Sequence, residues 1–187
     1  CPLQSGRGAV RDSVSTGSRG GVPRGAARMI HFLILVSRQG KVRLTKWYDT
    51  FPSSERNRIV REVSTLVLNR PPRYSNFIEW KERKVVYKRY ASLFFVACVD
   101  STDNELITLE KIHHFVEVLD RYFGNVCELD IIFNFHKAYY LLDEVFIGGH
   151  LQEANKLTIL EVCAHQDAMM EEGKEGAAGK TTSKVRG

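Results

Sequence analysis

The sequence predicts an α+β domain in which a five-stranded, mainly antiparallel sheet is covered by helices on both faces. The first observation is the run SLFFVACV at residues 92–99, which is unbroken, apolar and rich in aromatic and β-branched side chains. Turn-forming residues 100–103 close this run, so its length and boundaries indicate a strand buried on both faces. The second observation is that amphipathic helical patterns both precede and follow the run, which supplies the two layers that such a strand needs.

A hairpin is expected at the start of the domain. Residues 30–36 (IHFLILV) form a second buried run, and Gly40 lies in the turn that follows. Residues 42–48 then alternate with the period of two that is typical of a strand. The pair Gly40-Lys41 lacks the GxxxxGK[ST] spacing of a phosphate-binding loop and precedes a strand, so we interpret it as a hairpin turn.

One helix and two more strands follow before the central strand. Ser53 or Ser54 is expected to cap a helix that runs to about Leu68, where two prolines shortly afterwards prevent continuation. Strands at residues 76–81 and 84–88 then lead into the central run, which makes a three-stranded meander.

Two long helices are predicted after the central strand. Residues 104–124 carry one apolar stripe, with Asp103 or Thr102 as the expected N-cap and a glycine at the end. Residues 128–148 are predicted to form a single helix whose apolar side chains reach nearly round its circumference. Because such a helix must be buried on more than one side, we infer a partner protein. A final amphipathic helix is expected at about residues 154–170.

The charge and composition of the termini differ from those of the domain. Of the net charge of +5, residues 1–28 carry +4 and residues 168–187 carry +1, which leaves residues 29–167 neutral. A basic binding face is therefore absent from this part of the sequence, and we expect no nucleic-acid partner. We expect residues 1–28 to be a disordered extension outside the native protein, residues 29–170 to be the domain, and residues 171–187 to be a disordered tail.

No motif in the sequence predicts an enzyme, a metal site or a cofactor. The four cysteines have no close pairing, and the six histidines lack HExxH or CxxC-type metal spacing. The GxSxG and strand-associated GxGxxG patterns are also absent. We therefore expect a protein that acts by binding other proteins.

Three stretches resemble a known family. They are SRQGKVRLTKWYDTF, VVYKRYASLFFVACVD and DNELITLEKIHHFVEVLDRYFGNVCELDIIFNFHKAYYLLDE, which begin at residues 37, 85 and 103. They are similar to the small (sigma) subunits of the clathrin-associated adaptor complexes, without a gap from residue 29 to about 149. Within the family, RQGKVRL, ASLFFVA and DNELITLE are closer to the trans-Golgi and endosomal type, adaptor complex one. The order of predicted elements is also that of the longin-like fold.

The resemblance implies a subunit of a heterotetramer that works in vesicle-mediated protein transport. Its direct partner would be a large gamma-type adaptin, with a beta-type adaptin and a medium (mu) subunit completing the complex. The apolar helix at residues 128–148 would face the large subunit, through Phe133, Tyr140 and Phe146. The protein would be cytoplasmic and would reach trans-Golgi and endosomal membranes and coated vesicles only through the complex.

The resemblance also implies a binding site for acidic dileucine sorting signals of cargo tails. Such a signal has an acidic residue, three variable residues, and then Leu followed by Leu or Ile. By position, the leucine pocket would be lined by Ala91, Leu93, Val116, Val126 and Ile131, with Tyr90 and Asn125 beside it. Arg43 would face the acidic residue, together with a basic residue of the large subunit.

Two alternatives remain open at the level of sequence. Another longin-type trafficking subunit, such as a plasma-membrane adaptor, coatomer or tethering-complex small subunit, would bind partners through the same helices without this cargo specificity. A small enzyme or a nucleic-acid binder would need a polar cleft or a basic face. Taken without the family, each predicted pocket residue is interpreted as ordinary core, and Arg43 as a solvated strand residue.

Overall fold

The computed structural model describes residues 29–178, with side chains for residues 29–170. Its main sheet contains β1 (Phe32–Ser37), β2 (Val42–Trp47), β3 (Phe77–Trp80), β4 (Arg83–Tyr90) and β5 (Leu93–Asp100). The strand order is β2-β1-β5-β4-β3, and every neighbouring pair is antiparallel. The predicted hairpin, meander and central strand are therefore confirmed.

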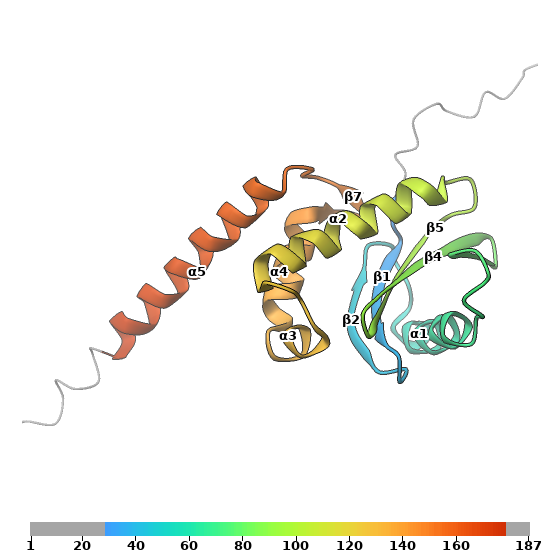
Figure 1. The fold of residues 1–187 in the computed structure, drawn as a ribbon, viewed down its shortest axis with the longest axis horizontal. Helices are drawn as coiled ribbons and strands as arrows, with labels where there is room; N and C mark the ends of the chain where they lie inside the picture. The colour runs from blue at the N-terminus through green and yellow to red at the C-terminus, as the bar shows by residue number, and fades with distance from the viewer. Residues whose placement is uncertain (1–28, 179–187) are drawn as a thin grey trace, which may run out of the picture.

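The two central strands are buried on both faces, as the sequence predicts. Residues of β1 and β5 pair directly, for example Ile34 with Val96 and Leu35 with Phe95. Successive side chains point to opposite faces, so Ile34 and Val96 join one core cluster while Leu35 and Phe95 join the other. Figure 1 shows the consequence, with α1 on one side of the sheet and α2, α3 and α4 on the other.

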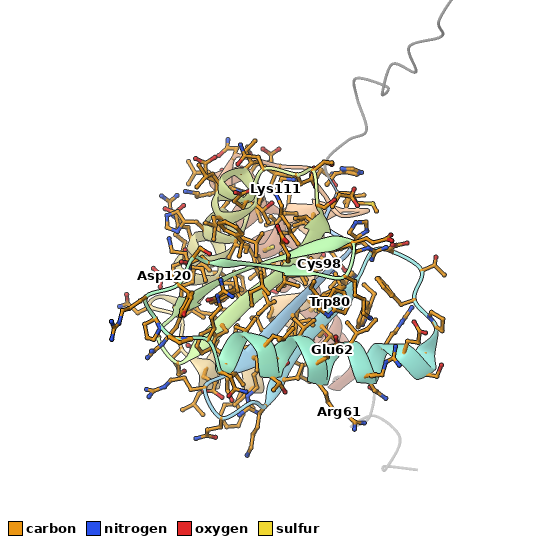
Figure 2. The ribbon with its side chains drawn as sticks, turned by 90° about the vertical axis from the view of Figure 1, so that its right-hand side faces the viewer. Arg61, Glu62, Trp80, Cys98, Lys111 and Asp120 are labelled. Carbon is orange, nitrogen blue, oxygen red and sulfur yellow. The ribbon has the colours of Figure 1, made fainter. Side chains whose placement is uncertain are left out.

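Helix α1 (Ser53–Leu68) covers one face through its buried residues Ile59, Val63 and Val67. Its N-cap is Pro52, and no side chain accepts a hydrogen bond there, so the expected serine cap is wrong. Proline fits this position because an N-cap residue donates no hydrogen bond within the helix, and its φ of −55° is close to the value that the proline ring fixes. Trp80 Nε1 of β3 donates to Glu62 Oε1 at 2.8 Å, which links the sheet to α1; both residues are labelled in Figure 2.

Helix α2 (Glu105–Phe123) crosses the opposite face of the sheet. Its N-cap is Asn104, whose side chain accepts a hydrogen bond from the Leu106 amide at 2.9 Å. The cap therefore lies one or two residues after the predicted Asp103 or Thr102. The helix ends at Gly124, whose φ of 67° is the left-handed conformation that favours glycine, so the predicted end is confirmed.

The single helix predicted for residues 128–148 is wrong, because it is two helices. A short helix α3 (Glu128–Phe133) is followed by α4 (Phe135–Val145), and Asn134 between them has a φ of −118° and a ψ of 39°. These angles lie outside the helical region, although Asn134 N still donates to the Asp130 carbonyl oxygen at 2.9 Å. Ala138, Leu141, Leu142 and Val145 of α4 are fully buried in the domain's own core.

The chain then forms a small second sheet and a long last helix. Strands β6 (Phe146–Ile147) and β7 (His150–Leu151) pair across a turn that the sequence analysis missed. Helix α5 (Lys156–Ala178) extends beyond α4 in Figure 1. It continues eight residues past position 170, the predicted end of the domain. The alanine, glutamate and lysine residues of this segment favour a helix despite its two glycines. The predictions for residues 1–28 and 179–187 lie outside the described residues.

Candidate functional site

The predicted cargo-binding residues come from five separate segments that the fold brings to one end of the sheet. Leu93 at the start of β5, Val116 on α2 and Ile131 on α3 belong to the same core cluster. Tyr90, at the end of β4, and Val126, in the loop between α2 and α3, pack against that cluster. Five of the seven residues predicted for the leucine pocket or beside it thus belong to one core cluster or pack against it.

The apolar residues of this cluster differ in how much surface they present. Ile131, Leu93 and Val116 are only 0%, 4% and 8% exposed, so they pack in the core rather than against solvent. Val126 is half-buried and Ala91 is exposed at the rim. These three side chains therefore present almost no surface in this structure, and two leucine side chains could contact them only after local rearrangement.

Two residues at the rim hold an unusual backbone conformation. Ala91, in the β4–β5 turn, has a φ of 50°, and Asn125, in the α2–α3 loop, has a φ of 62°. Left-handed conformations cost alanine more than asparagine, and such strain in a non-glycine residue is frequent at binding sites. The Ala91 carbonyl oxygen accepts a hydrogen bond from Arg89 Nε at 3.0 Å, which helps to hold this turn.

Arg43 is paired inside the chain. Its Nε and one terminal nitrogen lie 2.9 and 2.8 Å from the same oxygen, Oε1 of Glu128. The other oxygen of Glu128 accepts a hydrogen bond from Ser92 Oγ at 3.0 Å. One carboxylate at the start of α3 thus joins β2 to the β4–β5 turn. The sequence analysis missed Glu128 and Ser92, because no spacing along the chain indicates that they meet Arg43.

Tyr90 is fixed at the side of the cluster by its ring and by its hydroxyl group. The ring lies edge-on to Phe95 at a centroid distance of 5.6 Å and is stacked on the His113 ring at 6.1 Å. Its hydroxyl oxygen is 3.0 Å from His113 Nδ1. Tyr90 therefore links the end of β4 to α2 directly above the start of the central strand. His113 is a second neighbour that the sequence analysis did not assign to the site.

The predicted partner-facing residues do not share one surface. Phe133 is 74% exposed and Tyr140 is half-buried, whereas Phe146 is 1% exposed within the core. Phe146 is therefore not available to a partner, because its ring packs on Phe115 at a centroid distance of 6.3 Å. The structure instead exposes Leu129 and Phe135 near Phe133, by 58% and 56%. Leu129 and Phe133 lie before the break at Asn134 and Phe135 lies after it, and the position of this break was not evident from the sequence.

The histidines and carboxylates of the described part of the chain do not gather into a metal site. No group of three or more histidine, cysteine, aspartate or glutamate side chains within residues 29–170 could hold an ion. His31, which is buried, has Asp49 and Asp100 oxygens at 3.2 and 2.8 Å from its two ring nitrogens. Arg83 pairs with the same Asp49 at 2.9 Å. This cluster is consistent with a structural role for His31 at the end of the sheet.

Two free cysteines, Cys98 and Cys163, are buried. Burial raises the pKa of the Cys98 thiol to about 12 and that of Cys163 to about 11, so neither is an activated nucleophile at neutral pH. Across the described residues, none of the helices combines the length and the apolar character that a membrane span requires.

Comparison with known proteins decides the family. Residues 29–170 match the model of the clathrin adaptor complex small chain. This chain belongs to that family. It is 64% identical over 143 residues to the AP-1 complex subunit sigma-2 of Dictyostelium discoideum, which covers 76% of this chain and 93% of the relative. It is also 61% identical over 150 residues to the AP-1 complex subunit sigma-1 of Arabidopsis thaliana, covering 80% of this chain and 93% of the relative.

An animal relative and a structural neighbour agree with this assignment. The AP-1 complex subunit sigma-3 of Mus musculus is 56% identical over 147 residues, covering 79% of this chain and 96% of the relative. A chain in a structure described as a homology model of the full-length AP-3 complex in a stretched open conformation matches with a TM-score of 0.61 and 28% identity. That match covers 79% of this chain and 99% of the other, and the longin-like fold predicted from the sequence is confirmed. Family membership makes this protein a clathrin adaptor small subunit.

Proposed function

We propose that this small subunit binds acidic dileucine sorting signals as part of a heterotetrameric adaptor complex at trans-Golgi and endosomal membranes. Its relatives named above are subunits of AP-1 complexes, which supports this type over the plasma-membrane and coatomer alternatives. In this proposal the protein is not an enzyme, carries no cofactor and reaches membranes only through the complex.

The observation that carries the proposal is the placement of Arg43 beside an apolar cluster. Through Glu128, Arg43 is linked to the β4–β5 turn and to α3. Leu93 at the start of β5, Ile131 on α3 and Val116 on α2 supply the apolar cluster. A cation next to a group of aliphatic side chains matches the two parts of an acidic dileucine signal. The four residues come from elements that are far apart in the sequence, so this combination depends on the fold.

The expected affinity of the site is modest. Each leucine that enters an apolar pocket gains roughly 1.5–3 kcal/mol, and an exposed ion pair adds about 1 kcal/mol or less. After the cost of association, the dissociation constant is expected to be in the micromolar range. Weak binding of single signals is suited to a coat that gathers many cargo molecules through simultaneous contacts.

We propose that the large gamma-type adaptin covers the exposed apolar side chains around the α3–α4 break. Leu129, Phe133 and Phe135 present bulky apolar surface to solvent in the isolated chain. Large exposed apolar groups that lie close together are typical of protein interfaces. In the heterotetramer, the beta-type adaptin and the mu subunit would complete the assembly around this pair.

Peptide titration of the reconstituted complex by calorimetry tests the cargo site. Val126→Asp places a carboxylate at the half-buried rim, where leucine side chains must pass, and is expected to abolish binding of an acidic dileucine peptide. Arg43→Ser should weaken binding about fivefold, with a smaller effect at high salt. Val116→Asp should also abolish binding, but Val116 is 8% exposed, so this variant loses stability as well.

Val60→Asp is the matched control for the change of valine to aspartate. Val60 lies on α1, is half-buried like Val126, and packs against the other core cluster, on the opposite face of the sheet. The control should assemble and bind the peptide like the wild type. If an assembled Val126→Asp complex bound the peptide as tightly as the wild type, the proposed cargo site would be wrong.

A further inference from the structure

The pairing of Arg43 limits what this arginine can offer to an incoming acidic group. Glu128 Oε1 occupies the Nε side of the guanidinium, with contacts of 2.9 and 2.8 Å. A guanidinium has five N–H donors, so the edge formed by its two terminal nitrogens remains available for a second carboxylate. The two side chains are 21% and 22% exposed, so the ion pair lies at the surface, where a ligand can reach it.

Glu128 is itself held in place on its second oxygen. Ser92 Oγ donates to Glu128 Oε2 at 3.0 Å, so the carboxylate does not depend on Arg43 alone for its position. A peptide carboxylate that binds Arg43 would therefore meet Glu128 still in place. Two carboxylates that share one guanidinium lie only a few ångströms apart and repel each other.

We infer that Glu128 is a specificity-determining residue that competes with the signal's acidic residue for Arg43 and so lowers the preference of the site for acidic over neutral signals. The inference rests on the proposed function, because it concerns the same cargo site. The Glu128 carboxylate thereby keeps the binding of a single signal weak. A coat that must release its cargo benefits from such a limit.

Glu128→Gln isolates the charge from the hydrogen bonds. The amide oxygen of glutamine can still accept from Arg43 and its NH2 group can donate to Ser92 Oγ, while the negative charge disappears. Binding of two peptides is measured by calorimetry on the assembled complex: one with Glu at the acidic position and one with Gln there, otherwise identical. Like charges about 6 Å apart in water repel enough to change an affinity about threefold, and less screening makes the change larger.

For Glu128→Gln, the expected result is an affinity for the Glu peptide that is higher by at least about threefold, with a smaller increase at high salt. The affinity for the Gln peptide should not change. Glu128→Ala, which removes the same charge with another side chain, should also increase the preference for the Glu peptide over the Gln peptide. Glu110→Gln is the matched control, because Glu110 is an exposed residue on α2 and its change alters only the net charge. It should leave both affinities unchanged.

Three results would overturn the inference. Equal gains for both peptides would mean that Glu128 acts on access to the leucine pocket and not on charge. An unchanged or weaker affinity for the Glu peptide would mean that Glu128 only supports Arg43. An equal effect of Glu110→Gln would make the change a property of net charge. By contrast, failure of the wild-type complex to bind either peptide would contradict the proposed function itself.

Discussion

Arg43 on β2 contacts one oxygen of Glu128 through two nitrogens, at 2.9 and 2.8 Å. The sequence alone makes it a solvated strand residue, and the family resemblance makes it a contact for cargo. The structure adds that its charge is already partly neutralised within the chain. Removing Arg43 therefore deletes a cation and also leaves Glu128 with Ser92 as its remaining partner at that site. The effect of Arg43→Ser on acidic peptides thus includes repulsion by the freed carboxylate.

Gly149 offers a sharp test at the scale of one atom. A Cβ added there would lie 2.3 Å from the Ile30 carbonyl oxygen and 2.6 Å from Met29 Cγ, at a φ of 82°. Its own carbonyl oxygen accepts the Ile30 amide at 2.8 Å, so the two backbones cannot separate without loss of this bond. We expect Gly149→Ala to destabilise the fold by about 2–4 kcal/mol.

Gly148→Ala is the control for this substitution. Gly148 also has a positive φ, of 57°, but a Cβ there meets nothing within 4 Å. Gly148→Ala should destabilise the fold by only about 1–2 kcal/mol, which is the cost of a left-handed backbone conformation for alanine. Melting temperatures of the assembled complex should therefore fall in the order wild type, Gly148→Ala, Gly149→Ala. Equal melting temperatures for the two variants would show that the close contact of the added Cβ with Ile30 does not destabilise the fold.

At the scale of elements, the attachment of α5 to α2 should depend on pH. His114 on α2 has its Nε2 3.1 Å from the Glu153 carbonyl oxygen, just before α5. Desolvation lowers the pKa of His114 below its usual 6.5, although this hydrogen bond acts in the opposite direction. The unfolded chain therefore binds the proton more readily, and stability should fall as the pH drops through about 6.5 and below.

The measurement is the melting temperature of the complex at pH 7.5 and at pH 5.5. His114→Gln keeps a donor for the Glu153 carbonyl but cannot titrate, so its melting temperature should change less between these two pH values. If the variant lost as much stability as the wild type on acidification, His114 would not be the group responsible.

The break between α3 and α4 creates a second test at this scale. Phe133 is 74% exposed, and in the proposed assembly its ring is covered by the large subunit. Phe133→Ser should increase the soluble yield of the isolated chain and weaken assembly about tenfold or more, as for other aromatic anchors. Tyr74→Ser, at an aromatic residue 60% exposed in the loop before β3, should change neither. Unaltered assembly of Phe133→Ser, measured by titration with the large subunit, would contradict this interface.

The elements show where sequence reasoning succeeds and where it stops. The strands were predictable because a short apolar run bounded by turn-forming residues, such as residues 92–99, indicates a buried strand. The break at Asn134 was not, since the apolar pattern continues across it and asparagine is tolerated within helices. The pairing of Arg43 with Glu128 depends on two positions 85 residues apart, which no local pattern encodes. Phe146 was assigned to a partner because its burial by the chain's own core could not be foreseen.

At the scale of the whole molecule, we propose that one domain serves two purposes. The sheet, α2 and α3 hold the candidate cargo cluster, while the exposed end of α3 and the start of α4 are proposed to contact the large subunit. Because α3 contributes both Ile131 to the cluster and Leu129 to the exposed surface, the proposed interface and the proposed cargo site share one short helix. The closed cluster seen in the isolated chain and the proposed interface are therefore only a few residues apart.

The most direct test of the central claim is the set of proteins that this chain assembles with in cells. An affinity-tagged chain is purified from a cell extract, and the bound proteins are identified and quantified by mass spectrometry. The account predicts a gamma-type adaptin, a beta-type adaptin and a mu subunit in nearly equal amounts. Recovery of coatomer or tethering-complex subunits in their place, or of the chain without any adaptin, would contradict it.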